Sequence, residues 1–129
     1  MNRVVIDTNV LVSALLSPYG NPAKIFDLAM NGSLIICYDS RIISEYREVL
    51  KRPRFGFEEK AANRIIDFII RSGLSIVPEP VINNFEDEDD KKFYEVAKSA
   101  NAYLVTGNAK HFPNEPLIVT PAKFLKISF

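Results

Sequence analysis

Residues 3–16 read RVVIDTNVLVSALL, and this stretch decides how the rest of the chain is interpreted. Three apolar residues, 4–6, precede Asp7, and a second apolar run with helical spacing follows. A short apolar run that ends in a polar turn is typical of a strand buried on both faces of a parallel sheet. Asp7 is therefore predicted at the carboxyl end of the first strand, where open α/β sheets bind ligands. Thr8 or Asn9 is predicted to cap the following helix.

The composition is that of an ordinary globular protein, with 47% hydrophobic and 25% charged residues among 129. Sixteen basic and sixteen acidic residues cancel, so the chain lacks the positive field of a general DNA coater. One cysteine excludes an internal disulfide framework. No apolar stretch approaches the roughly 18 residues that span a bilayer, and no secretion signal is evident. We expect residues 1–129 to form a single cytoplasmic domain without membrane association.

Helical and strand patterns alternate along the chain, which predicts a three-layer α/β/α sandwich with a mostly parallel sheet. Further strands are expected at residues 34–38, 74–77, 103–105 and 117–119, and helices at 22–31, 40–51, 58–71, from the acidic run 86–90 to about 100, and at 121–125. Asn21 and Asp39 are predicted helix caps. Gly32 is predicted to end a helix in the left-handed conformation, and a later helix is predicted to stop at Gly73.

Two carboxylates lie where a solvated face is not expected. Glu45 falls at the edge of the apolar stripe of its helix, and an ion pair with Arg41 or a functional role fits that position equally well. Asp90 falls within the apolar face of its helix, three residues before Phe93. The inward direction of Asp90 favours a metal ligand, whereas the rest of its acidic run is predicted to cap the helix and face solvent.

Asp7, Glu45 and Asp90 start from different elements and are expected to converge at one rim of the sheet. Carboxylate oxygens with little histidine or thiol nearby suit Mg²⁺ or Mn²⁺ and poorly suit zinc. Such ions catalyse phosphoryl chemistry by activating water and by stabilising charge on the phosphate oxygens. The three acids are therefore predicted to be catalytic residues and metal ligands.

The segments VIDTNVLVSALL, SEYREVL and DEDDKKFYEVAKSANAYLVTGNAKHF occur in that order and resemble the PIN domain, specifically the small prokaryotic PIN proteins regarded as toxins of toxin-antitoxin pairs. The resemblance implies a PIN-like fold and a Mg²⁺- or Mn²⁺-dependent endoribonuclease that is inhibited by a small antitoxin protein and is often a homodimer. On matching positions, Asp7, Glu45 and Asp90 correspond to the first three acids of the family. Thr106 corresponds to the polar residue that ends the fourth strand.

Asn108 departs from the family pattern, because a fourth acid is usual at this position. An amide oxygen can still bind a hard cation or hold a water molecule, but one negative charge is lost, so metal affinity should fall. Asn108 also suits a turn after glycine. The expected arrangement has Asp7 and Asp90 on the ion, with Glu45 on the ion or on the attacking water. Thr106, Asn108 and Asn9 are expected to support these ligands.

Basic residues near the predicted rim are candidates for holding RNA, although each also suits an ordinary surface position. They are Arg41, Lys91, Lys92 and Lys110. His111 is the only histidine, and both a general base and a turn-packing residue are consistent with its position.

Three other readings remain. A catalytically weak PIN fold that only binds RNA or a protein partner is compatible with Asn108. A phosphatase of the haloacid dehalogenase type is disfavoured because Asn9 stands where a second aspartate is needed. A receiver domain lacks the required paired acids after the first strand. No glycine-rich turn follows that strand, which excludes a dinucleotide-binding fold.

Overall fold

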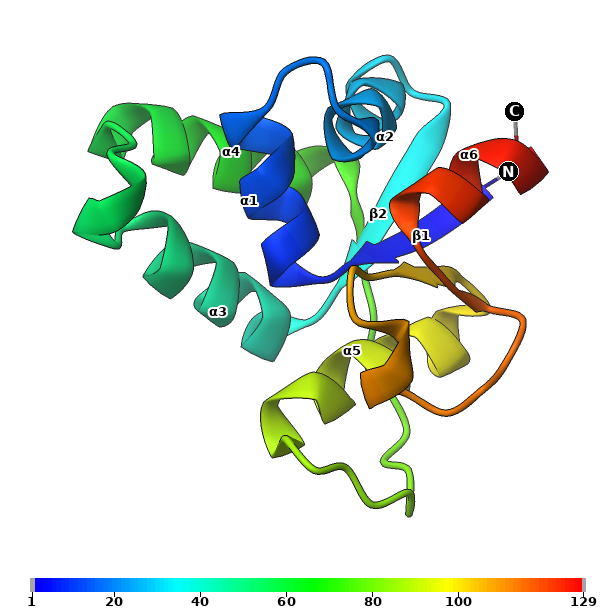
Figure 1. The fold of residues 1–129 in the computed structure, drawn as a ribbon. Coiled ribbons are helices and arrows are strands. Elements are labelled where there is room, and N and C mark those ends of the chain that lie inside the picture. The colour runs from blue at the N-terminus through cyan, green and yellow to red at the C-terminus, as the bar shows by residue number, and fades with distance from the viewer. Residues whose placement is uncertain (1, 129) are drawn as a thin grey trace.

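The computed structural model describes residues 2–128 and contains one five-stranded sheet in the order β3-β2-β1-β4-β5 (Figure 1). All neighbouring strands are parallel. The strands are β1 (Asn2–Ile6), β2 (Leu34–Tyr38), β3 (Leu74–Ser75), β4 (Tyr103–Val105) and β5 (Ile118–Val119).

Helices cover both faces of the sheet, with α5 on one face and α1 and α2 on the other (Figure 1). The helices are α1 (Thr8–Leu16), α2 (Asn21–Met30), α3 (Ser40–Leu50), α4 (Glu59–Ser72), α5 (Glu88–Ala100) and α6 (Pro121–Ser128). This arrangement confirms the predicted three-layer α/β/α sandwich. None of the helices between residues 2 and 128 has the length and apolar character that a membrane span requires.

The central strand β1 is the buried strand that the opening stretch predicts. Val4 and Val5 are fully buried, and Ile6 is nearly so. In the register, Ile6 lies opposite Val105 of β4. Asp7 continues this ladder, since its backbone N–H donates to the Val105 carbonyl oxygen at 3.0 Å. The end of β1 is therefore held firmly against the end of β4.

Several local predictions about helix ends are wrong. Helix α1 begins at Thr8 with Asp7 in the capping position, and no side chain caps it. Asn21 is the first residue of α2 rather than its cap. In contrast, α4 ends at Gly73 as predicted, with Gly73 in an extended conformation. Asp39 also caps α3 through the Ile42 N–H, as predicted.

Strand β3 is shorter than predicted, because it is an edge strand that pairs with β2 only at Leu74 and Ser75. The residues after Ile76 form a connector that leads to α5, and Val77 in this connector is 95% exposed. Helix α6 is longer than the single turn predicted there, since it extends from Pro121 to Ser128.

Candidate functional site

The site lies where the strand order of the sheet reverses, between β1 and β4. Such a switch point is where open α/β sheets bind ligands. Asp7 follows β1 and Thr106 follows β4, and the Thr106 hydroxyl donates to Asp7 Oδ2 at 2.7 Å. Asp7 is 6% exposed and Thr106 is fully buried. This hydrogen bond fixes the direction of the Asp7 carboxylate at the rim of the sheet.

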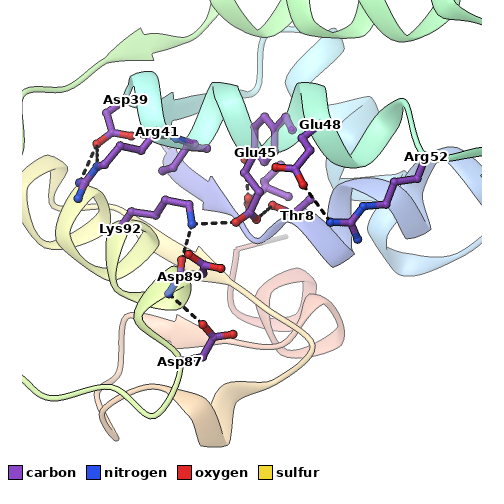
Figure 2. A network of polar contacts seen from close by, with 12 residues as sticks. Thr8, Asp39, Arg41, Glu45, Glu48, Arg52, Asp87, Asp89 and Lys92 are labelled. Carbon is purple, nitrogen blue, oxygen red and sulfur yellow. Dashed lines mark hydrogen bonds and ion pairs between the residues drawn. The ribbon is translucent and has the colours of Figure 1, made fainter.

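Glu45 reaches the same rim from the middle of α3 (Figure 2). The Thr8 hydroxyl donates to Glu45 Oε2, and Lys92 Nζ lies 2.8 Å from Glu45 Oε1. The Tyr46 hydroxyl donates to the Ile6 carbonyl oxygen at 2.5 Å, which ties α3 to the end of β1. These contacts hold Glu45 beside the first turn of α1.

Asp90 approaches the rim from the first turn of α5, where Asp87 caps the helix by accepting from the Asp89 N–H. Asp90 Oδ2 lies 3.6 Å from His111 Nδ1. One pocket contains Asp90 and His111, and a second pocket contains Glu45 and Lys92. The amino end of α5 contributes residues to both pockets.

The negative charges of Glu45 and Asp90 each interact with Asp7. Burial raises the pKa of Asp7, and repulsion by Glu45 adds to this rise, while the Thr106 hydrogen bond opposes it. Burial also raises the pKa of Asp90, with further contributions from the negative charges of Asp7 and Asp87. Asp7 therefore lies near each of the other two acids, while Glu45 and Asp90 line different pockets.

The acids are not arranged as a preformed metal centre. Among residues 2–128, no group of three or more His, Cys, Asp or Glu side chains is placed to hold a metal ion. Glu45 is bound by Thr8 and Lys92, and Asp90 faces His111. The three carboxylates thus share one rim without sharing a common centre.

A profile of the PIN domain matches residues 3–110, which is most of the chain. The chain belongs to the PIN domain family. PIN domains are generally nucleases and generally use divalent metal ions. Protein MJ1680 of Methanocaldococcus jannaschii, which is described as uncharacterized, is 35% identical over 109 residues that cover 82% of this chain and 70% of that protein.

A solved structure has the same fold as this PIN domain. It is VapBC2 from Rickettsia felis bound to a DNA fragment from its promoter. The match has a TM-score of 0.57 and 18% sequence identity, and it covers 92% of this chain and 96% of that one. The likeness at this identity supports the fold assignment.

The remaining predicted site residues of the PIN domain occupy different settings. Asn9 is exposed. Asn108 is also exposed, and its backbone N–H donates to Thr106 Oγ1 at 3.0 Å. Lys91 is half-buried beside the Glu45 pocket, and Lys110 is exposed beside the Asp90 pocket. Of Thr106, Asn108 and Asn9, the residues expected to support the acid ligands, Thr106 donates directly to one of them.

Two of the four cations predicted to hold RNA are engaged by acids. The Arg41 guanidinium lies 2.7 Å from Asp39 Oδ2 and 2.8 Å from Glu95 Oε1, so the ion pair considered between Arg41 and Glu45 does not form. Lys92 is buried and pairs with Glu45 instead. Lys92 is therefore not available to a phosphate, whereas the half-exposed Arg41 would meet one with part of its charge already balanced.

The sequence analysis missed the buried acid Glu95. Its second carboxylate oxygen accepts from the Val81 N–H at 2.9 Å, so Glu95 ties the connector before α5 to Arg41. The pattern of α5 gave little signal, because the six consecutive residues 92–97 are all buried. An acid in a helix covered on nearly all sides must find partners, and Glu95 has them.

The raised pKa values of Asp7 and Asp90 predict a pH-dependent stability of the metal-free PIN domain. A carboxyl with a raised pKa binds its proton more tightly when folded, so its stabilising contribution is complete below about pH 4 and is lost as the pH rises. We expect Asp7→Asn to become more stable relative to wild type as the pH increases. Urea unfolding in EDTA across this range measures the difference, and a difference that is constant with pH would contradict the prediction.

Proposed function

We propose that this PIN domain is a divalent-metal-dependent endoribonuclease that hydrolyses RNA phosphodiester bonds as the toxin of a toxin-antitoxin pair. The observation that carries the proposal is the hydrogen bond from Thr106 to Asp7 at the switch point, with Glu45 and Asp90 on the same rim. Membership of a family of nucleases supports the reaction class. We treat residues 1–129 as one catalytic domain.

The chemistry of the side chains fits Mg²⁺ or Mn²⁺. Asp7, Glu45 and Asp90 offer hard carboxylate oxygens, which these ions prefer. The Lys92 ammonium group already lies among these acids, so the rim accommodates positive charge. A bound divalent ion would supply charge that activates water and stabilises the phosphate oxygens.

Each residue has a role that follows from its contacts. Asp7 and Asp90 would bind the ion, and Thr106 keeps the Asp7 carboxylate in place by donating to Oδ2. Glu45 would bind the ion or orient the attacking water, with Thr8 holding one of its oxygens. Removing the proton from that water would be the task of a carboxylate at this rim.

Lys91 and Lys110 are the remaining candidates for holding the RNA backbone. Each lies at one of the two pockets that flank the amino end of α5, and neither makes an ion pair with the residues described, 2–128. Phosphate contacts from lysine position a strand without reading its sequence. With one lysine in each pocket, an RNA strand bound by both would cross the amino end of α5 next to the acids.

We further propose a small antitoxin protein as partner, together with a homodimer in the cytoplasm. The named complex VapBC2 supports the first part, since its fold is shared by this chain. The reading frame next to the gene is the informative observation here. A short neighbouring gene for a DNA-binding protein would support the toxin role.

A PIN fold that binds RNA or a partner without cutting is the second candidate function. Asn108 favours it, because the exposed amide replaces an acid and adds no charge to the rim. The structure does not support a phosphatase of the haloacid dehalogenase type. Such a phosphatase needs a second aspartate at the position of Asn9, and Asn9 is exposed.

Cleavage of single-stranded RNA by the purified chain distinguishes the two candidates. We expect products with Mn²⁺ or Mg²⁺ and none in EDTA. Calorimetry with Mn²⁺ is run on the same preparation. RNA binding without cleavage and without heat of Mn²⁺ binding would favour the binding module and contradict the nuclease.

Thr106→Val tests the support given to Asp7. Valine has a similar shape but lacks the hydroxyl that donates to Asp7 and accepts from the Asn108 N–H. We expect Mn²⁺ affinity to fall roughly 10- to 100-fold, which is the usual effect of losing a partner that orients a ligand. Calorimetry measures the change. Thr106→Ser keeps the hydroxyl and should retain near wild-type affinity, and equal affinities in all three proteins would show that Thr106 plays no such role.

A further inference from the structure

Lys92 extends from α5 to the Glu45 carboxylate rather than into solvent (Figure 2). We call Asp7, Glu45 and Asp90 the acid cluster. Only 11% of its side chain is exposed. Its Nζ lies 2.8 Å from Glu45 Oε1 and donates to the Asp89 carbonyl oxygen at 2.5 Å. The same nitrogen lies 5.0 Å from the centre of the Phe93 ring. A buried ammonium group held by these partners has a defined position.

The charge of Lys92 acts on the whole cluster. It counteracts the rise that burial causes in the pKa of Asp7 and of Asp90. When ionised, Asp7, Glu45 and Asp90 carry three negative charges, and Lys92 reduces the net charge to two. Close like charges destabilise a folded chain, so a built-in cation stabilises this cluster in the absence of metal.

Arg41, the other cation near Glu45, is not available for this role. Its guanidinium is bound by Asp39 and Glu95. Within residues 2–128, Lys92 is the cation that forms an ion pair with Glu45. A lysine ammonium group and a hard divalent ion both bind carboxylate oxygens. Lys92 already occupies Glu45 Oε1, so an ion that binds this oxygen must displace it.

We propose that Lys92 is a tethered cation that competes with a divalent metal ion for Glu45 and thereby weakens binding of that ion. The proposal rests on the proposed function, because it assumes that the ion binds at these acids. Lys92 acts through Glu45 and is therefore a positioning residue. It also gives a reason why the three acids do not form a preformed metal centre: one of them is already paired.

Lys92→Met is the decisive variant, because methionine keeps most of the length of the side chain and removes the charge. We expect its Mn²⁺ dissociation constant to fall by about tenfold relative to wild type, which lies within the range that one interaction between contacting residues contributes. In EDTA the variant should unfold at a lower temperature, and Mn²⁺ should raise its unfolding temperature by more than in wild type. Calorimetry and thermal unfolding measure these two quantities.

Further variants distinguish competition for Glu45 from a general effect of positive charge on Mn²⁺ binding. Lys91→Met removes the same charge from the neighbouring residue, which lacks an ion pair in the described structure, and should tighten Mn²⁺ binding much less. Lys92→Arg keeps the charge and should stay near wild type. In a Glu45→Gln background, Lys92→Met should tighten Mn²⁺ binding much less than it does in wild type, because the shared carboxylate is gone and only the weaker effect of Lys92 on Asp7 and Asp90 remains. Lys92→Gln replaces Lys92→Met if the latter does not fold.

The outcomes distinguish this proposal from the nuclease proposal. A purely structural role predicts weaker Mn²⁺ binding in Lys92→Met, and that result would overturn competition. Equal tightening by Lys91→Met and Lys92→Met would also overturn it. If neither wild type nor Lys92→Met binds Mn²⁺, the metal assignment and the competition fail together. If wild type binds Mn²⁺ through Asp7 and Lys92→Met binds no tighter, only the competition fails.

Discussion

Asp7→Asn is expected to lower RNA cleavage by about 100-fold or more, since a direct ligand should matter at least as much as the residues that orient it. Asparagine keeps the shape and can still accept the Thr106 hydroxyl, but it removes a charge that the ion needs. The free energy of unfolding should not fall, because the ionised Asp7 is buried and repelled by Glu45, and asparagine removes both costs. Activity and stability should therefore move in opposite directions.

The matched control for this variant is Asp87→Asn. It also converts one aspartate of the rim to an amide, but Asp87 is the cap of α5, and asparagine caps helices equally well. Initial rates of RNA cleavage with Mn²⁺, together with urea unfolding in EDTA, are measured for both variants. Wild-type activity in Asp7→Asn would show that the catalytic residues lie elsewhere.

Gly73→Ala is expected to have the largest effect on stability, a loss of about 3 kcal/mol, at the upper end of what overpacking costs. A Cβ atom at Gly73 would lie 2.4 Å from the Ile36 carbonyl oxygen and 2.5 Å from that of Ile69. Both are backbone atoms, so they cannot rotate away. The backbone of α4 or β2 must move, which would weaken the pairing of β3 with β2.

Gly107→Ala provides the control for the loss of glycine itself. A Cβ atom there would meet no atom within 4 Å, and its φ is not in the left-handed region. Its stability should stay within about 0.5 kcal/mol of wild type. Urea unfolding of both variants gives the comparison, and a Gly73→Ala protein as stable as Gly107→Ala would mean that α4 does not pack this closely against β2.

The position of Asp7 could be predicted from the sequence because the signal is local. An apolar run that ends in a polar turn requires only neighbouring residues, and β1 has the predicted burial and partners. The inward direction of Asp90 followed from helical spacing in the same way. Helical spacing also singled out Glu45 but left an ion pair and a functional role equally open. The family resemblance then added Thr106, whose place on the rim comes from a segment distant in sequence.

The contacts of the site could not be predicted, because tertiary partners replaced local ones. Thr8 is a good capping residue by type, yet its hydroxyl donates to Glu45. Lys92 carries a charge that suits the surface, yet its long side chain reaches from α5 to Glu45 on α3. Both contacts depend on the packing of α3 against α1 and α5, which cannot be predicted from the pattern of neighbouring residues.

The hydrogen bond between Asp7 and Thr106 joins residues that are 99 positions apart. During synthesis on the ribosome, Asp7 therefore emerges long before Thr106, which orients it. Strand β1 cannot pair with β4 until residues 103–105 have been synthesised. A nascent chain interrupted before residue 106 has β1, α3 and the acids of α5 but cannot complete the rim. Translation past residue 106 is thus a condition for completing the hydrogen bond that orients Asp7.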